Sequence, residues 1–274
     1  FEINLYKYNI ISMTYQLFLS FTILSTLILS VITYRNAFVN GKPHCNNFVT
    51  NVYLYLALSF ALIGSFVHVY NFIFNPASQR GKHIDEYIAY SQIMPYIFVS
   101  FVISIVSIII LSMGDMFTKD GILVNHTLWL VFVGSIALTL YPIFKSKQLA
   151  TIVPRALLMT VGIFLLMSFF VYAFPTFFES TYKRMTTGLL IALLIIIMAE
   201  LYLIASDSYT QGQYKIISYV LISLFSLYVS YDTSRILNYA KKCIDSPNYP
   251  KISTSLLIDI VNIFVRLVGV SRDR

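Results

Sequence analysis

Apolar runs long enough to cross a membrane recur along almost the whole of this chain. A helix of about 17 to 25 apolar residues spans the hydrocarbon core of a bilayer. A helix also satisfies its own backbone hydrogen bonds, which lipid cannot do. Eight segments meet this length, with short polar stretches between them: residues 16–33, 51–74, 92–113, 128–144, 156–174, 185–204, 215–238 and 252–270. The pattern predicts an all-α polytopic membrane protein.

The composition supports this class and argues against others. Of the 274 residues, 58% are hydrophobic and only 11% are charged, too few polar residues to cover a soluble globule of this size. The net charge of +7 is scattered over short loops, so we expect no nucleic-acid partner. No phosphate loop, nucleophile elbow or zinc-protease motif is present, and we expect no enzyme activity. Cys45 and Cys243 lack metal-ligand spacing and are expected to be unbridged thiols.

Two acidic residues lie inside the last two predicted spans. Asp232 is six residues before the end of segment 215–238, and Asp259 is seven residues after the start of segment 252–270. At 1.5 Å per residue, each carboxylate lies roughly 10 Å from one shared membrane face. The connection, residues 239–251, is short enough to make the two helices antiparallel neighbours. We therefore expect two carboxylates at matching depth.

A carboxylate in hydrocarbon is costly, so such residues usually face the interior of a bundle and mark a functional site. If Asp232 and Asp259 face each other, their like charges cannot both ionise in a low dielectric, and the pair should share a proton. Carboxylate oxygens are also the ligands that calcium prefers. We predict a proton switch and a calcium-binding site at this pair. Calcium would be the bound or transported ion, with no resident cofactor.

Two further charged residues are candidates for the site. Arg235 follows Asp232 by three residues and lies on nearly the same helical face, one turn nearer the membrane surface. It could hold a deprotonated Asp232 in an ion pair that closes a pore, or it could extend to the lipid headgroups. Glu200 lies a few residues before the end of segment 185–204, and we expect it to extend to the interface. The alternative is an inward-facing acid that assists the aspartate pair.

The sequence around the two aspartates resembles a family signature. Residues 225–237 read FSLYVSYDTSRIL, and residues 256–268 read LLIDIVNIFVRLV. They are similar to the paired signature of the transmembrane Bax inhibitor motif family, in which an aromatic-rich helix ending in Tyr-Asp-Thr precedes a helix carrying Asp-x-x-Asn-Ile-Phe. Softer matches at residues 52–64 and 155–172 extend the resemblance over about 52–270.

The resemblance implies a bundle of seven family-like spans plus one extra N-terminal transmembrane helix. It divides the chain into residues 1–50, which hold the extra helix and a loop, and residues 51–274, which form the Bax-inhibitor-like bundle. Arg266, shortly after the Asn-Ile-Phe tripeptide, and the extra N-terminal segment look like the family's mitochondrial inner-membrane branch. The ER and Golgi membranes stay open as locations, and so does the orientation, because the basic residues of an eight-span chain divide ten to nine between the two sides.

For function, the resemblance implies a pH-sensitive calcium leak channel or calcium/proton exchanger, with Asp232 and Asp259 as switch and cation ligands. A second interpretation is a structural subunit of a larger, mitochondrial membrane assembly that keeps the fold without transport. An aromatic, Ile-rich outer surface would suit partner helices as well as lipid. A membrane hydrolase is the third interpretation, and its metal ligands would have to come from His68, Glu200 and the two aspartates, which have no recognisable spacing.

Overall fold

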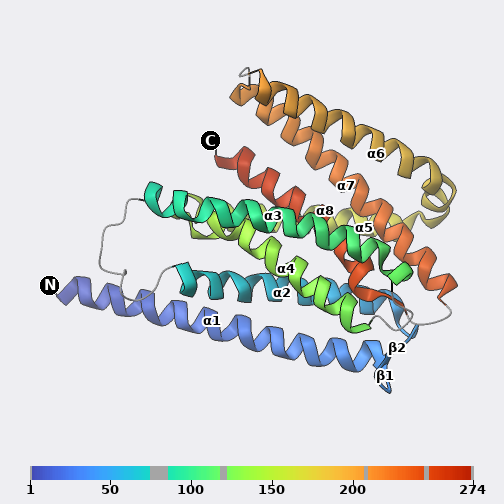
Figure 1. Ribbon diagram of the computed structural model, residues 1–274, viewed down its shortest axis with the longest axis horizontal. Coiled ribbons are helices and arrows are strands. Elements are labelled where there is room, and N and C mark those ends of the chain that lie inside the picture. Colours follow the sequence, from blue (N-terminus) through green and yellow to red (C-terminus); the bar gives the residue numbers. More distant parts are fainter. Residues whose placement is uncertain (1, 75–85, 118–121, 207–208, 244–246, 273–274) are drawn as a thin grey trace. The chain divides into compact units, whose positions relative to one another are not determined.

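The computed structural model describes residues 2–74, 86–117, 122–206, 209–243 and 247–272. Long helices make up almost all of this part of the chain (Figure 1). In chain order they are α1 Glu2–Ala37, α2 Phe48–Phe74, α3 Glu86–Phe117, α4 Ile122–Lys145, α5 Ile152–Ala173, α6 Pro175–Ala205, α7 Gln211–Lys242 and α8 Tyr249–Arg272. A short 3₁₀ helix, η2 Lys147–Leu149, connects α4 to α5.

A small β-hairpin joins α1 to α2. Its strands are β1 Phe38–Val39 and β2 Lys42–Pro43, paired antiparallel with Phe38 opposite Pro43. The two turn residues, Asn40 and Gly41, both have positive φ, 52° and 75°. An Asn-Gly turn of this kind matches the twist of the flanking strands, which explains why the chain reverses tightly here.

Seven helices of the described chain, α2 to α8, are long and apolar enough to cross a membrane. The predicted all-α membrane bundle is therefore confirmed, and α1 provides the additional N-terminal helix. Helix α1 begins at Glu2 rather than near residue 16, so helix extends well beyond the apolar run that predicted it. Its crossing of the membrane stays a prediction from the sequence.

Helix packing groups the chain into two units. The first comprises residues 1–144 and 245–251, and the second comprises residues 145–244 and 252–274. The first unit therefore holds α1 to α4 and the start of α8, and the second holds α5 to α7 and the rest of α8. The predicted boundary at residue 50 separates the extra N-terminal helix from the family-like bundle. It rests on the family resemblance rather than on helix packing, and it stays a prediction.

Within the first unit, hydroxyl and aromatic side chains join α2 to α4. The Trp129 indole donates to the Ser59 hydroxyl at 3.1 Å, and the Tyr55 hydroxyl lies 2.7 Å from Nε2 of His126. Buried Trp and Tyr usually find such partners, because an unsatisfied polar group in an apolar interior is costly. These contacts keep the two helices in register.

The residue that opens α8 is bound to the loop between α1 and α2. The Tyr249 hydroxyl donates to the carbonyl of His44, and the Asn51 amide donates to the Tyr249 hydroxyl at 3.1 Å. The α1–α2 loop and the start of α8 are therefore at the same end of the first unit. A chain of eight crossings requires this placement, because the connections before α2 and before α8 both follow an odd-numbered span.

Both cysteines, Cys45 in the α1–α2 loop and Cys243 directly after α7, are disulfide-bonded. The expectation of two unbridged thiols is wrong. Sequence spacing did not reveal this, because disulfide formation depends on distance in space, and nearly 200 residues separate the two cysteines.

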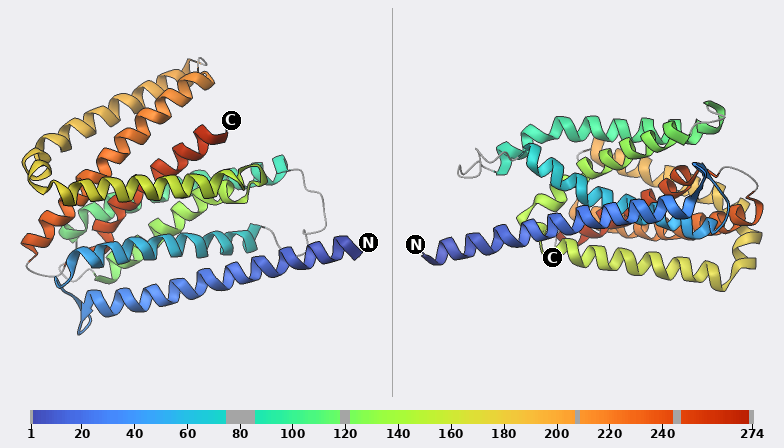
Figure 2. Two further views of the ribbon diagram at one scale, coloured as in Figure 1. Left: turned by 180° about the vertical axis from the view of Figure 1, so that it is seen from behind. Right: turned by 90° about the horizontal axis from the view of Figure 1, so that it is seen from below.

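In the second unit, α7 lies beside α6 and α5 (Figures 1 and 2). Its start is set by a capping box: the Thr210 hydroxyl accepts from the Gln213 backbone, and the Gln213 side chain accepts from the Thr210 backbone. Residues 252–271 of α8 are all buried or partly buried, so no face of this part of the helix is fully exposed. A helix enclosed in this way can carry a carboxyl that would be costly in lipid.

Candidate functional site

Asp232 is buried on α7 and faces α8. The residue is only 5% exposed, and the Ser255 hydroxyl of α8, which donates to the Ile252 carbonyl at 3.3 Å, lies near its carboxyl. On its own helix, Oδ1 of Asp232 is 3.8 Å from Nη1 of Arg235. The carboxyl is therefore held between the neighbouring helix and a cation one turn away.

Asp259 lies one turn after Ser255 on α8, and it is 6% exposed. Residues four apart share a helix face, so Asp259 points to the same side of α8 as Ser255, which lies near Asp232. The two carboxyls are close enough to interact electrostatically. Oδ2 of Asp259 is buried and has no hydrogen-bond partner among the described residues. A buried carboxyl oxygen left unsatisfied is costly, and a proton or a cation would relieve that cost.

The structure thus brings both sequence-predicted aspartates to one helix interface. No hydrogen bond joins the two carboxyls directly within the described chain, and the Ser255 hydroxyl lies near the carboxyl of Asp232. The Tyr228 side chain also interacts electrostatically with both carboxyls. Sequence reasoning missed Ser255 and Tyr228. The signal was available, because each lies four residues before one of the aspartates.

The position of Arg235 matches neither of its two predicted roles fully, the ion pair with Asp232 or the extension to lipid headgroups. Its 3.8 Å distance to Asp232 is long for an ion pair, and its side chain is 28% exposed. Its Nε donates to the Tyr239 hydroxyl at 3.4 Å, and its guanidinium lies over the Tyr239 ring at 5.3 Å from the centroid. A cation stacked on an aromatic ring keeps part of its stabilisation if the carboxylate becomes neutral.

Glu200 does not join the aspartate pair. Its carboxylate accepts two hydrogen bonds from the Arg266 guanidinium, at 2.7 and 2.8 Å, and a third from the Tyr209 hydroxyl at 2.8 Å. Arg266 follows Asp259 by seven residues, about 10 Å farther along α8. The predicted extension of Glu200 to the interface stays a prediction, and the structure adds that Arg266, a distant residue in sequence, binds both of its carboxylate oxygens. The acid is not an auxiliary to the pair in this structure.

Tyr209 closes this second charged cluster from the turn between α6 and α7. Burial, followed by the hydrogen bond to the Glu200 carboxylate, raises the pKa of Tyr209 to about 12. The folded protein therefore favours the neutral phenol that donates to Glu200. Stability from this contact should be present below about pH 10 and be lost as the pH rises toward 12, because the unfolded chain loses its proton first.

A close approach of Tyr214 to Gly269 fixes the neighbouring end of α8. A Cβ added at Gly269 would collide with the Tyr214 hydroxyl oxygen and lie 2.9 Å from the ring carbon that bears it. Only glycine leaves room for this ring. The contact brings the start of α7 against the last turns of α8.

We expect Gly269→Ala to lower the thermal midpoint of the purified protein, by an overpacking cost of about 1 to 3 kcal/mol. Tyr214→Ala should largely restore the midpoint of the alanine variant, since it removes the atoms that collide. As a control, Gly162→Ala adds a methyl where no atom lies within 4 Å. A loss in Gly162→Ala as large as that in Gly269→Ala would contradict this explanation.

No group of three or more His, Cys, Asp or Glu side chains comes together as a metal site in the described part of the chain. The aspartate pair therefore offers a cation two carboxyls and the Ser255 hydroxyl, and water would supply its other ligands. Calcium takes about six to eight oxygen ligands, so such a site would hold it weakly. Weak binding suits an ion that must leave again.

Comparison with known proteins supports the family resemblance. The family model described as "Inhibitor of apoptosis-promoting Bax1" matches residues 45–271. This range includes α2 to α7 and all of α8 except its last residue, and therefore both aspartates, and it leaves out α1. No curated protein matches the chain. The resemblance drawn from the two C-terminal helices is confirmed at the level of the family.

Proposed function

This chain belongs to the family of inhibitors of apoptosis-promoting Bax1, and on that premise we propose that it is a pH-sensitive calcium leak channel or calcium/proton exchanger. The family is linked to calcium homeostasis. The finer activity rests on one observation: two buried carboxyls meet at the α7–α8 interface, and one of their oxygens lacks a partner among the described residues.

In this proposal the pair binds either protons or a cation. If both carboxylates were ionised and no cation were bound between them, they would repel each other in a low dielectric. A calcium ion between them would remove that repulsion, and so would protonation of one carboxyl. Proton and calcium occupancy are therefore mutually exclusive at the same oxygens, which couples ion passage to pH.

Calcium flux in liposomes tests the proposal. The purified protein would be reconstituted with a calcium indicator inside and a pH indicator in parallel vesicles. We expect calcium influx that changes with pH. Proton efflux that scales with calcium entry would identify an exchanger, and influx without it a leak channel. Intact protein that gives no flux above empty liposomes at any pH would overturn the proposal.

Arg235 is expected to act as the gate. The ion pair with Asp232 would hold the pair closed while that carboxyl is ionised. We therefore expect Arg235→Ala to raise basal calcium flux and to weaken its dependence on pH. Lys242→Ala removes a cation from the end of the same helix and provides the matched control. Unchanged flux in Arg235→Ala across the pH range would contradict the gating role and favour the interpretation that Arg235 only contacts lipid headgroups.

A structural role in a larger membrane assembly is the second candidate. Helix α6 favours it, because only 6% of the residues in its most apolar stretch are buried against other described parts of the chain. Its surface would suit partner helices as well as lipid. Native gels of mildly solubilised membranes distinguish the two: migration only within a large complex, together with no flux from the isolated protein, would favour the structural role.

We also propose the mitochondrial inner membrane as its location, from the sequence similarity to that branch. The two disulfide-bonded cysteines support an orientation in which the α1–α2 and α7–α8 loops face an oxidising compartment. A maleimide that adds mass should label the denatured protein only after reduction. Labelling without reductant in freshly isolated membranes would contradict this orientation.

A further inference from the structure

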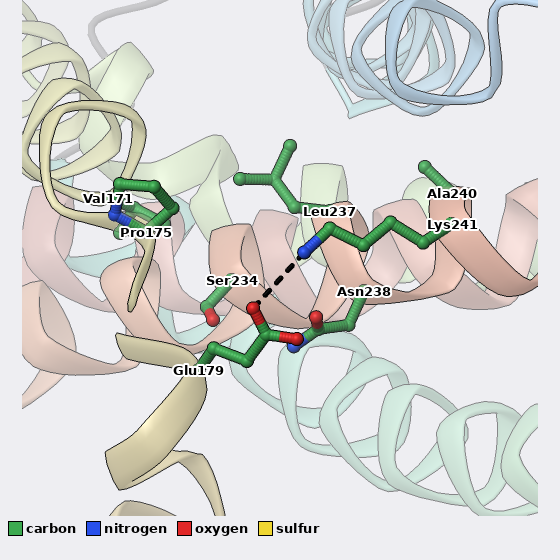
Figure 3. A pocket seen from close by; sticks show the side chains of 8 residues that line it. All are labelled: Val171, Pro175, Glu179, Ser234, Leu237, Asn238, Ala240 and Lys241. Atoms are coloured by element: carbon green, nitrogen blue, oxygen red, sulfur yellow. Dashed lines mark hydrogen bonds and ion pairs between the residues drawn. The ribbon is translucent and has the colours of Figure 1, made fainter. Parts of the chain in front are cut away.

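An open pocket of about 370 Å³ lies in the second unit where α5, α6 and α7 meet. Its volume is at the lower end of the range of about 300 to 1,000 Å³ typical of small-molecule sites. Figure 3 shows the side chains around it. Four are polar, Glu179, Ser234, Asn238 and Lys241, and four are apolar, Val171, Pro175, Leu237 and Ala240.

This pocket is separate from the aspartate pair. Ser234 follows Asp232 by two residues, which places it about 200° around the helix. Asp232 faces α8, whereas Ser234, Asn238 and Lys241 line the side of α7 toward α5 and α6. The proposed ion site does not use these residues.

The polar side of the pocket carries one acid, one base and a hydroxyl. Nζ of Lys241 donates to Oε2 of Glu179 at 3.1 Å, an ion pair in which both side chains are more than half exposed. Ser234 is only 5% exposed, yet no described residue bonds to its hydroxyl. In Figure 3 that hydroxyl points toward the Glu179 carboxylate. This side chain lines the open pocket, so its hydroxyl can donate to or accept from a ligand there.

From the positions of the helix ends around it, we expect this pocket to lie at the depth of the lipid headgroups. Helix α5 ends at Ala173, α6 begins at Pro175, and Lys241 is in the last turn of α7. The exposed aromatic residues Tyr172, Phe174 and Phe177 flank the same helix ends. Aromatic side chains of this kind typically lie at the boundary between hydrocarbon and headgroups. A lipid could therefore place its headgroup in the pocket and its acyl chains along α5.

We propose that this pocket binds the phosphoethanolamine headgroup of a membrane phospholipid. The phosphate would accept from the Lys241 ammonium, and the primary ammonium would donate to the Glu179 carboxylate, the Ser234 hydroxyl and the Asn238 carbonyl oxygen. The pocket's single acid and single base match a zwitterion that carries one charge of each sign. A trimethylated choline has no N–H to donate, and a purely anionic headgroup would compete with Glu179 for Lys241 and offer no cation in return.

Native mass spectrometry of the detergent-purified chain tests the site. The protein would be presented with equal amounts of phosphatidylethanolamine, phosphatidylcholine and phosphatidylglycerol. We expect one saturable phosphatidylethanolamine adduct, bound about tenfold more tightly than phosphatidylcholine, since charge-assisted hydrogen bonds to the ammonium distinguish the two lipids.

Two variants separate the two halves of the headgroup. Glu179→Gln should remove the preference for ethanolamine over choline. Lys241→Met should weaken both lipids about tenfold and leave their ratio intact, because both carry the phosphate. Lys242→Met removes the adjacent lysine, which does not line the pocket, and should match the wild type. Circular dichroism would verify that each variant is folded.

Several results would overturn the proposal. These are equal binding of all three lipids, a preference for phosphatidylglycerol, or a loss in Lys242→Met equal to that in Lys241→Met. The last measurement is a competition between the bound lipid and soluble glycerophosphoethanolamine, which has the same headgroup but no acyl chains. If it displaces the lipid at equal concentration, the site takes the free headgroup compound rather than a membrane lipid.

Discussion

Asp259→Asn is expected to abolish the pH response of calcium flux while leaving the bundle folded. The substitution keeps the shape of the side chain and removes its charge. It therefore ends the repulsion from Asp232 and the competition between proton and calcium for the unsatisfied carboxyl oxygen. In the liposome influx assay described above, the ratio of fluxes at mildly acidic and mildly alkaline pH should fall to about 1.

The paired substitution provides the sharper measurement. Asp232→Asn should lose the pH response to the same extent, and the double variant should behave like either single variant, because groups that titrate together are not additive. If each aspartate only bonded a local group, the variants would show independent, additive stability losses and a normal pH response. That result would contradict the proposal that Asp232 and Asp259 act together as a proton switch. Thr160→Val is a suitable control, since its buried hydroxyl donates to its own helix, at the Ala156 carbonyl.

Arg266→Ala is expected to cause a larger loss of stability than Gly269→Ala. It leaves the Glu200 carboxylate without the guanidinium that binds both of its oxygens. The two side chains are only 17% and 22% exposed, so water replaces the lost bonds poorly. Removing one partner of such a pair costs about 3 to 5 kcal/mol. The measurement is the thermal midpoint of the purified variant in detergent.

A double-mutant cycle isolates the pair. Glu200→Gln combined with Arg266→Gln should be more stable than the sum of the single losses predicts, because no uncompensated charge remains. The Glu179–Lys241 pair is a built-in comparison: its side chains are 54% and 60% exposed, and Lys241→Ala should cost no more than about 1 kcal/mol. Equal losses from Arg266→Ala and Lys241→Ala would contradict a special role for the buried pair.

The sequence alone was sufficient for the class of fold and for identifying the two aspartates of the candidate site. Apolar length predicted the seven spans α2 to α8, because hydrocarbon thickness imposes a length on every crossing helix. Asp232 and Asp259 could be recognised because a carboxylate is conspicuous in an apolar segment, and a short loop between two spans makes them neighbours. The depth of a residue follows from counting along a helix, which needs no tertiary information.

Only the tertiary structure decided which side chains meet. Glu200 and Arg266 are 66 residues apart, and neither pattern nor spacing indicates that α6 and α8 bring them together. The disulfide-bonded state of Cys45 and Cys243, the approach of Tyr214 to Gly269 and the pocket beside Ser234 are of the same kind. In an apolar helix the sequence sets depth, but rotation about the axis depends on how neighbouring helices pack. Nearly every face of such a helix is apolar, so packing alone selects the partners of its few polar residues.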